Sequence, residues 1–117
     1  MNKAIPRKIS PKELHQWMNE ESNKPFLIDV REDQELMIAS FPSQVLHLPL
    51  SRFSFWSENL SKLVPLDQSV VVLCHAGIRS LNFGIWLLEQ NLGYQVWNLD
   101  GGIDAWSLDV DSDVPRY

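Results

Sequence analysis

The sequence predicts an α/β domain whose core is a mostly parallel β-sheet. Short apolar segments alternate along the chain with segments of helical periodicity, and the connections between them are short. Residues 69–74 (SVVVLC) are β-branched and apolar, which is typical of a central strand buried on both faces of a parallel sheet. With 117 residues the chain has room for one core, so we expect residues 1–117 to form a single domain.

The N-terminal half is expected to begin with a capped helix. Residues 10–13 (SPKE) combine a serine N-cap, a proline at the first helical position and a glutamate three residues after the cap, so they predict a helix that ends near Glu21. Residues 26–30 (FLIDV) predict a short buried strand. A short helix over 32–38, a strand over 45–48 and a weakly helical stretch over 52–63 are expected next. Pro49 keeps the 45–48 strand out of the middle of the sheet, because proline cannot donate to a ladder.

The C-terminal half is expected to hold the most regular helix, after a loop at residues 75–78. Apolar residues recur there at helical spacing and predict a largely buried helix with Gly93 as its C-cap. The predicted stripe consists of Leu81, Ile85, Leu88 and Leu92, widened by Phe83, Trp86 and Leu87. A strand over 94–99, a tight turn at 101–102, a short helix over 103–106 and an acidic tail complete the chain.

Composition and charge exclude several classes of function. Ten basic residues against fifteen acidic ones give a net charge of -5, which disfavours nucleic-acid binding. No apolar run reaches the roughly 18 residues that span a bilayer, and no apolar segment of a signal peptide follows the first residues. We therefore expect a cytoplasmic protein without a membrane partner, either a monomer or a weak dimer.

The single cysteine, Cys74, limits the bonding chemistry of the chain. A disulfide within the chain and a zinc site built from several thiolates both need further cysteines. His15, His47 and His75 lack the spacing of metal ligands, so no metal site is expected. Stability must therefore come from packing.

Cys74 lies at the predicted carboxyl end of the central strand, which is where ligands bind in open parallel sheets. Backbone N–H groups of the following turn and helix start can converge on its sulfur, and Gly77 allows the tight turn that this needs. Such an array, with the guanidinium of Arg79 nearby, stabilises a thiolate. A lone cysteine is more often a core residue, and Arg79 alone is also compatible with a surface salt bridge. Gly77, Arg79 and the helix start together favour a catalytic cysteine.

Three motifs resemble the single-domain rhodanese family of sulfurtransferases. They are CHAGIRS at residues 74–80, DVRE at 29–32 and GGIDAW at 101–106, in the order and at the spacing of that family, and VPRY at 114–117 is similar to the tail of bacterial members. The match spans nearly the whole chain. The resemblance implies a rhodanese-like fold with the active-site loop between a central strand and a helix N-terminus.

The resemblance also implies a covalent cycle that needs no cofactor. Cys74 would take a sulfane sulfur from a donor such as thiosulfate, hold it as a persulfide and pass it to a thiophilic acceptor such as cyanide, a thiol or a protein. The substrate-binding residues implied are those of the loop, His75, Ala76, Gly77, Ile78, Arg79 and Ser80. Asp29 and Arg31 would brace this loop by hydrogen bonds.

Other interpretations remain open at this point. Phosphatases and arsenate reductases of the same fold carry five residues between cysteine and arginine, whereas four separate Cys74 from Arg79, and the smaller cradle favours sulfur transfer. A non-catalytic or partner-dependent module for sulfur delivery or regulation is the alternative from another class. Residues 39–43 (ASFPS) depart from the family's Gly-His-Ile-Pro-Gly segment, and His75 leaves the donor undecided.

Overall fold

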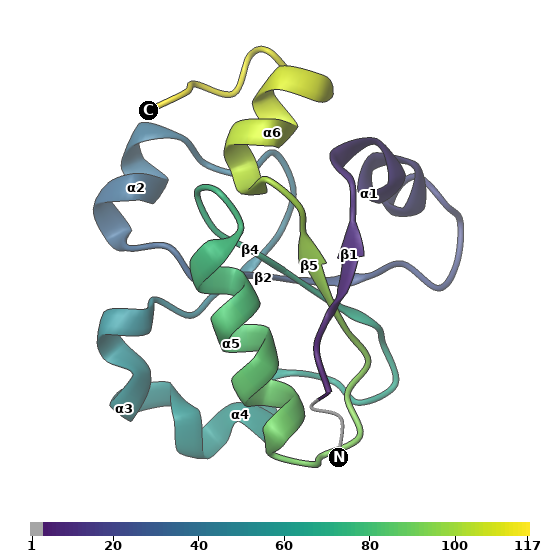
Figure 1. The fold of residues 1–117 in the computed structure, drawn as a ribbon, viewed down its shortest axis with the longest axis vertical. Coiled ribbons are helices and arrows are strands. Elements are labelled where there is room, and N and C mark those ends of the chain that lie inside the picture. Colours follow the sequence, from purple (N-terminus) through teal and green to yellow (C-terminus); the bar gives the residue numbers. More distant parts are fainter. Residues whose placement is uncertain (1–3) are drawn as a thin grey trace.

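The computed structural model of the protein describes residues 4–117 and is built around a parallel β-sheet (Figure 1). In these residues the sheet has five strands in the order β1-β5-β4-β2-β3, and every neighbouring pair is parallel. The strands are β1 (Arg7–Ile9), β2 (Phe26–Asp29), β3 (Leu46–His47), β4 (Val70–Leu73) and β5 (Val96–Leu99). The predicted α/β class and the central position of β4 are confirmed. Residues 1–3 of the predicted 1–117 domain lie outside the described residues.

Helices cover both faces of the sheet (Figure 1). The α-helices are α1 (Pro11–Met18), α2 (Asp33–Ile38), α3 (Phe53–Trp56), α4 (Leu60–Leu63), α5 (Ile78–Glu89) and α6 (Gly102–Asp109), with short 3-10 helices at Leu50–Arg52 and Ser57–Asn59. Val70 and Val72 of β4 pack into a core under α3, α4 and α5, whereas Val71 and Leu73 pack into a second core under α1 and α6. Burial on both faces explains why β4 is continuously apolar.

Several local predictions are confirmed with shifted boundaries. The Ser10 hydroxyl accepts from the Glu13 amide at 3.1 Å, the Glu13 carboxylate accepts from the Ser10 amide at 3.1 Å, and the capped helix ends at Met18. β3 lies at a sheet edge, as Pro49 predicts. Residues 39–43, which depart from the family's usual segment, are held by the side chain of Phe41. This side chain is 6% exposed, and the centroid of its ring lies 4.7 Å from that of Trp106.

The predicted stripe on α5 is confirmed at its centre and wrong at its ends. Phe83 and Leu87 are buried, and Trp86 and Leu88 pack against the core. Leu81 and Leu92 are 37% and 43% exposed, and the helix ends at Glu89, before Gly93. Its buried residues are Ser80, Phe83, Gly84 and Leu87. A Cβ at Gly84 would meet the Pro6 ring and the Val96 side chain, so the helix lies close to its neighbours at this glycine, and the residues one turn away share its face.

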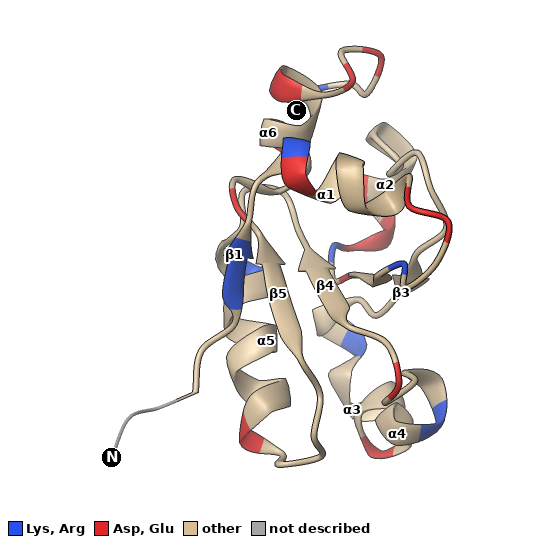
Figure 2. Cartoon of the chain, turned by 90° about the vertical axis from the view of Figure 1, so that its right-hand side faces the viewer, with Lys and Arg blue, Asp and Glu red and all other residues tan. Residues whose placement is uncertain are grey.

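The edge strand β1 is a feature that the sequence pattern does not predict. It has three residues, and Arg7 and Lys8 are exposed at the outer edge of the sheet, where Figure 2 shows them in blue. Charged side chains on an edge strand discourage pairing with another chain. Within residues 4–117 we find no helix that combines the length and the apolar character needed to span a membrane.

Candidate active site

Cys74 directly follows β4 and is 1% exposed. The chain then turns through residues 75–77 into α5, and Gly77 caps that helix with a φ of +96°, a backbone conformation that favours glycine. A Cβ on Gly77 would lie 3.2 Å from the Gly101 nitrogen and 3.3 Å from the Leu99 oxygen. The loop is thus pressed against the end of β5 and the start of α6.

Two backbone amides point to the sulfur of Cys74, and a hydroxyl oxygen lies in contact with it. The amide of Gly77 lies 3.1 Å from Sγ, the amide of Ser80 3.4 Å and the hydroxyl of Ser80 3.2 Å. Donors at the N-terminus of a helix favour a negative charge on the acceptor. Of the predicted loop residues, Gly77 and Ser80 therefore contact the sulfur, whereas Ala76 and Ile78 are exposed on the outside of the turn.

Asn98 of β5 forms hydrogen bonds to the cysteine loop, and the sequence analysis did not predict this role. Its Nδ2 donates to the Gly77 carbonyl at 3.0 Å, and its Oδ1 accepts from the Ser80 hydroxyl at 2.6 Å. The side chain is 6% exposed. A polar residue in the otherwise apolar strand β5, near its carboxyl end, is the signal by which sequence reasoning could have found it.

α6 fixes the other side of the loop. Its first amides bind the loop carbonyls, with Ile103 N donating to Cys74 O at 2.9 Å and Asp104 N to His75 O at 3.1 Å. Gly102 makes this approach possible, because its φ is +64° and a Cβ there would lie 2.5 Å from the Cys74 carbonyl oxygen. The GGIDAW motif therefore positions the backbone of the cysteine loop.

Arg79 points to Glu35 on α2. Its Nη1 and Nη2 donate to the two oxygens of the Glu35 carboxylate, each at 2.8 Å. The Arg79 hydrogen bonds hold the pKa of Glu35 at about 2, well below its usual value, and the pKa of Arg79 is raised in turn. The side chains are 37% exposed for Arg79 and 18% for Glu35. Sequence reasoning missed Glu35, because it placed Arg79 as the partner of an anionic substrate.

Asp29 and Arg31 form a pair that is wholly buried. Arg31 Nη2 donates to Asp29 Oδ2 at 2.8 Å, and both side chains are 0% exposed. Burial would lower the pKa of Arg31, but the hydrogen bonds to Asp29 and Tyr117 outweigh it and raise the pKa. Arg31 Nη1 donates to the Tyr117 hydroxyl at 3.0 Å, and that hydroxyl donates to Glu35 Oε1 at 3.1 Å. The pair thus reaches the cysteine loop through Tyr117, Glu35 and Arg79.

Tyr117 also covers His75. The two rings are stacked, with centroids 4.1 Å apart and an interplanar angle of 18°. Burial raises the pKa of Tyr117, so its hydroxyl stays protonated and able to donate at neutral pH. His75 therefore lies against an aromatic ring at the rim of the loop.

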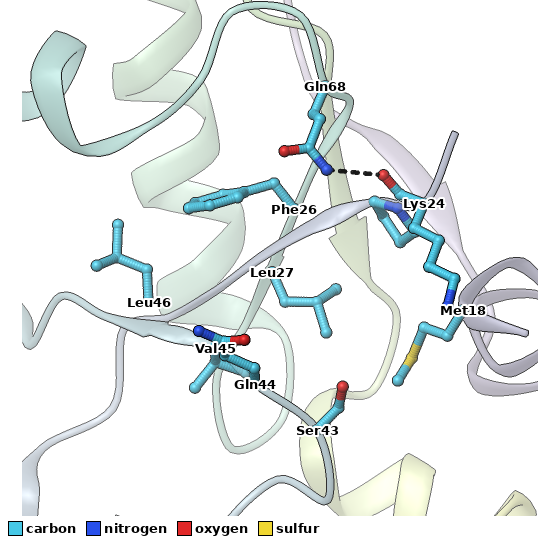
Figure 3. A pocket seen from close by; sticks show the side chains of 10 residues that line it. Met18, Lys24, Phe26, Leu27, Ser43, Gln44, Val45, Leu46 and Gln68 are labelled. Atoms are coloured by element: carbon cyan, nitrogen blue, oxygen red, sulfur yellow. Dashed lines mark hydrogen bonds between the residues drawn. The ribbon is translucent and has the colours of Figure 1, made fainter. Parts of the chain in front are cut away.

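A separate pocket of about 430 Å³ lies at the amino ends of β2 and β3 (Figure 3), and Cys74 is not among its lining residues. It is lined by Met18, Lys24, Pro25, Phe26, Leu27, Ser43, Gln44, Val45, Leu46 and Gln68. Gln68 and the Lys24 carbonyl close one side with a hydrogen bond of 3.1 Å. This pocket lacks the cysteine and the converging donors, so the candidate active site is assigned by the chemistry of the loop.

Comparison with known proteins gives consistent matches. A family model for the rhodanese-like domain matches residues 10–109. The chain is 37% identical over 111 residues to Rhodanese-like/PpiC domain-containing protein 12, chloroplastic, of Arabidopsis thaliana, covering 93% of this chain and 36% of that protein. It is 37% identical over 81 residues to the putative sulfurtransferase YtwF of Bacillus subtilis, covering 69% of this chain and 72% of the relative.

Longer relatives and solved structures agree with this match. A tRNA uridine(34) hydroxylase of Chlamydia caviae is 35% identical over 105 residues, which are 87% of this chain and 31% of that protein. A rhodanese-related protein of Thermoplasma volcanium superposes with a TM-score of 0.68 at 26% identity, covering 93% and 95% of the two chains. Reduced Bacillus anthracis CoADR-RHD superposes with a TM-score of 0.75 at 26% identity, covering 96% of this chain and 18% of that one. Fold, cysteine loop and family model coincide, and the chain belongs to the rhodanese-like domain family.

Proposed function

We propose that the protein is a sulfurtransferase that carries a sulfane sulfur on Cys74. With thiosulfate, the Cys74 thiolate attacks the sulfane sulfur, the sulfur–sulfur bond breaks, and sulfite leaves with the electron pair. The product is a Cys74 persulfide. A thiophilic acceptor, such as cyanide or a thiol, then attacks the outer sulfur and releases the Cys74 thiolate, so no cofactor is consumed.

The observation that supports this proposal is the convergence of two backbone amides and one hydroxyl on one sulfur atom. The Gly77 amide and the amide and hydroxyl of Ser80 lie within 3.4 Å of Cys74 Sγ. Donors that are already oriented stabilise negative charge without reorganisation during the reaction. These groups stabilise the Cys74 thiolate that attacks the donor. They stabilise the same thiolate again when it is released as the acceptor takes the outer sulfur.

The burial of Cys74 suits a carrier. Its side chain is 1% exposed, which restricts direct access to Sγ. A second sulfur places the reactive atom about 2 Å beyond Sγ, since that is the length of a sulfur–sulfur bond. The persulfide thus reaches an acceptor that the bare thiol reaches poorly.

Intact-mass measurement tests the proposal directly. Reduced wild type and Cys74→Ser are mixed briefly with thiosulfate, with 3-mercaptopyruvate or with a thiol persulfide, and cyanide is then added. We expect the wild type alone to gain one sulfur atom and to lose it to cyanide as thiocyanate. Gain or transfer of sulfur by folded Cys74→Ser contradicts the mechanism, and the absence of any adduct in folded wild type with a free thiol contradicts loading from small donors.

A partner-dependent delivery role is the second candidate. The match covers 36% and 31% of two longer relatives, so in those proteins a domain of this kind is joined to other parts. In such a role Cys74 receives its sulfur from one protein and passes it to another. Loading from a protein-bound persulfide, without loading from any small donor, assigns this role.

A further inference from the structure

The Glu35 carboxylate is fixed beside the cysteine loop by four hydrogen bonds. Two come from Arg79, one from the Glu32 amide at 2.9 Å and one from the Tyr117 hydroxyl at 3.1 Å. The carboxylate is 18% exposed. A group that is held by four donors does not swing away to let another anion take its place on Arg79.

The guanidinium groups around the loop are each matched by a carboxylate. Arg79 pairs with Glu35 and Arg31 with Asp29, while Arg116 pairs with Asp104 at 2.8 Å. Arg79 is the guanidinium of the cysteine loop itself, five residues after Cys74. The guanidinium of the cysteine loop is therefore already neutralised by Glu35.

A donor with a double negative charge meets a penalty at such a site. Thiosulfate must compete with Glu35 for the Arg79 donors, and it is repelled by a carboxylate that cannot retreat. A thiol persulfide brings its sulfane sulfur without a dianionic head group, so it does not need a free guanidinium.

We propose that Glu35 is a specificity-determining residue that selects thiol persulfides over thiosulfate as sulfur donors. This inference rests on the proposed sulfur transfer at Cys74. In the favoured step, the Cys74 thiolate attacks the outer sulfur of R–S–SH and the sulfur–sulfur bond breaks. The thiolate RS⁻ leaves with the electron pair, and Cys74–S–SH keeps the hydrogen on the transferred sulfur.

The test compares the rate of Cys74 persulfide formation with two donors. One donor is thiosulfate, and the other is the persulfide of N-acetylcysteine amide, which carries no charge outside its persulfide group. Glu35→Gln keeps the shape of the side chain and removes its charge. We expect this variant to react about tenfold faster with thiosulfate and within about twofold of the wild-type rate with the persulfide, because one nearby charge is removed.

Asp33→Asn is the matched control. Asp33 lies on the same helix and pairs with Arg52 at 2.7 Å in a bidentate arrangement, but away from Cys74. It should leave the ratio of the two rates unchanged. Glu35→Asp, which restores the charge, should return the ratio towards that of the wild type. Added salt should narrow the difference between wild type and Glu35→Gln with thiosulfate.

The outcomes separate this inference from the proposed function. If wild type loads from both donors and folded Glu35→Gln leaves the ratio of rates unchanged, the specificity role is overturned and sulfur transfer stands. An equal rise with both donors also overturns it, because the effect is then a general one on Cys74. If folded wild type loads from neither donor, the proposed loading of Cys74 by small donors fails and the inference fails with it.

Discussion

The side-chain amide of Asn98 donates a hydrogen bond to the carbonyl oxygen of Gly77, 3.0 Å away and 21 residues earlier in the chain. The same side chain accepts from Ser80, which in turn contacts the sulfur of Cys74. One buried residue of β5 therefore supports both the end of the turn and the first turn of α5 beside the candidate nucleophile. Its removal should affect stability and reactivity together.

Asn98→Ala is expected to lower the free energy of unfolding by about 1–3 kcal/mol, because the Gly77 carbonyl and the Ser80 hydroxyl lose a buried partner. Persulfide formation at Cys74 should slow about tenfold, since the donors to the sulfur are less well held. Urea unfolding and loading from a thiol persulfide measure the two effects. Asn82→Ala, at an exposed position on α5, should change neither. An unchanged loading rate in Asn98→Ala refutes the positioning role.

Gly102→Ala should be among the most damaging substitutions near the loop. The new Cβ would collide with the carbonyl oxygens of Cys74 and His75, and the φ of +64° is unfavourable for alanine. We expect a loss of at least about 2 kcal/mol in unfolding free energy, together with slower loading of Cys74.

Gly93→Ala separates the effect of backbone strain from the effect of steric overlap. Gly93 also has a positive φ, +94°, but a Cβ there would meet nothing within 4 Å. The free energy of unfolding of this variant should fall by about 1 kcal/mol, and its Cys74 should load sulfur at the wild-type rate. Thermal or urea unfolding of both variants checks the difference. Equal losses of stability would mean that the backbone conformation alone, and not the approach of α6 to the loop, makes the glycine necessary.

Asp29→Ala should lower the free energy of unfolding by about 3–5 kcal/mol, because it leaves the buried Arg31 guanidinium without its partner carboxylate. Asp33→Ala removes the same kind of partner from Arg52 at the surface, where solvent compensates the loss, and should change stability little. Urea unfolding of the two variants measures the contrast. Similar losses in both would show that burial is not what makes the Asp29 pair important.

The ion pair between Glu35 and Arg79 predicts how the stability of the protein depends on pH. The pKa of Glu35 is about 2 in the folded protein and near 4.5 when the chain is unfolded, so its contribution is complete above pH 4.5 and disappears as the pH falls towards 2. We expect the free energy of unfolding of wild type to exceed that of Glu35→Gln by on the order of 2 kcal/mol at pH 6. This value allows for solvent screening of the partly exposed Arg79. The difference should shrink steadily below pH 4.5. Urea unfolding from pH 6 to 2 tests this, and a constant difference contradicts it.

Local patterns account for the features that the sequence predicts well. The capping box of Ser10 and Glu13 involves residues three apart, and the valines of β4 are adjacent in the chain. The Cys74 loop lies between two strongly patterned elements. Each of these signals is complete within a few residues, so it can be interpreted without knowing the fold.

Long-range partners account for the features that were missed. Glu35 meets Arg79 across 44 residues and Tyr117 across 82, and nothing near Glu35 in the sequence indicates either contact. The two ends of the stripe on α5, Leu81 and Leu92, were misassigned for a related reason. Its periodicity fits more than one face, and the face that is buried is decided by how closely Gly84 approaches Pro6.

The place of β1 in the sheet has a consequence for the order of events during synthesis. Ile9 pairs with Leu99, which is made 90 residues later. At about 5–20 residues per second, the first strand waits roughly 5–18 s for its partner. A strand with free edges is prone to pair with other chains during such a delay, and the charges of Arg7 and Lys8 oppose this. These two residues, which contribute little to the finished core, thus protect the nascent chain while β5 is still being made.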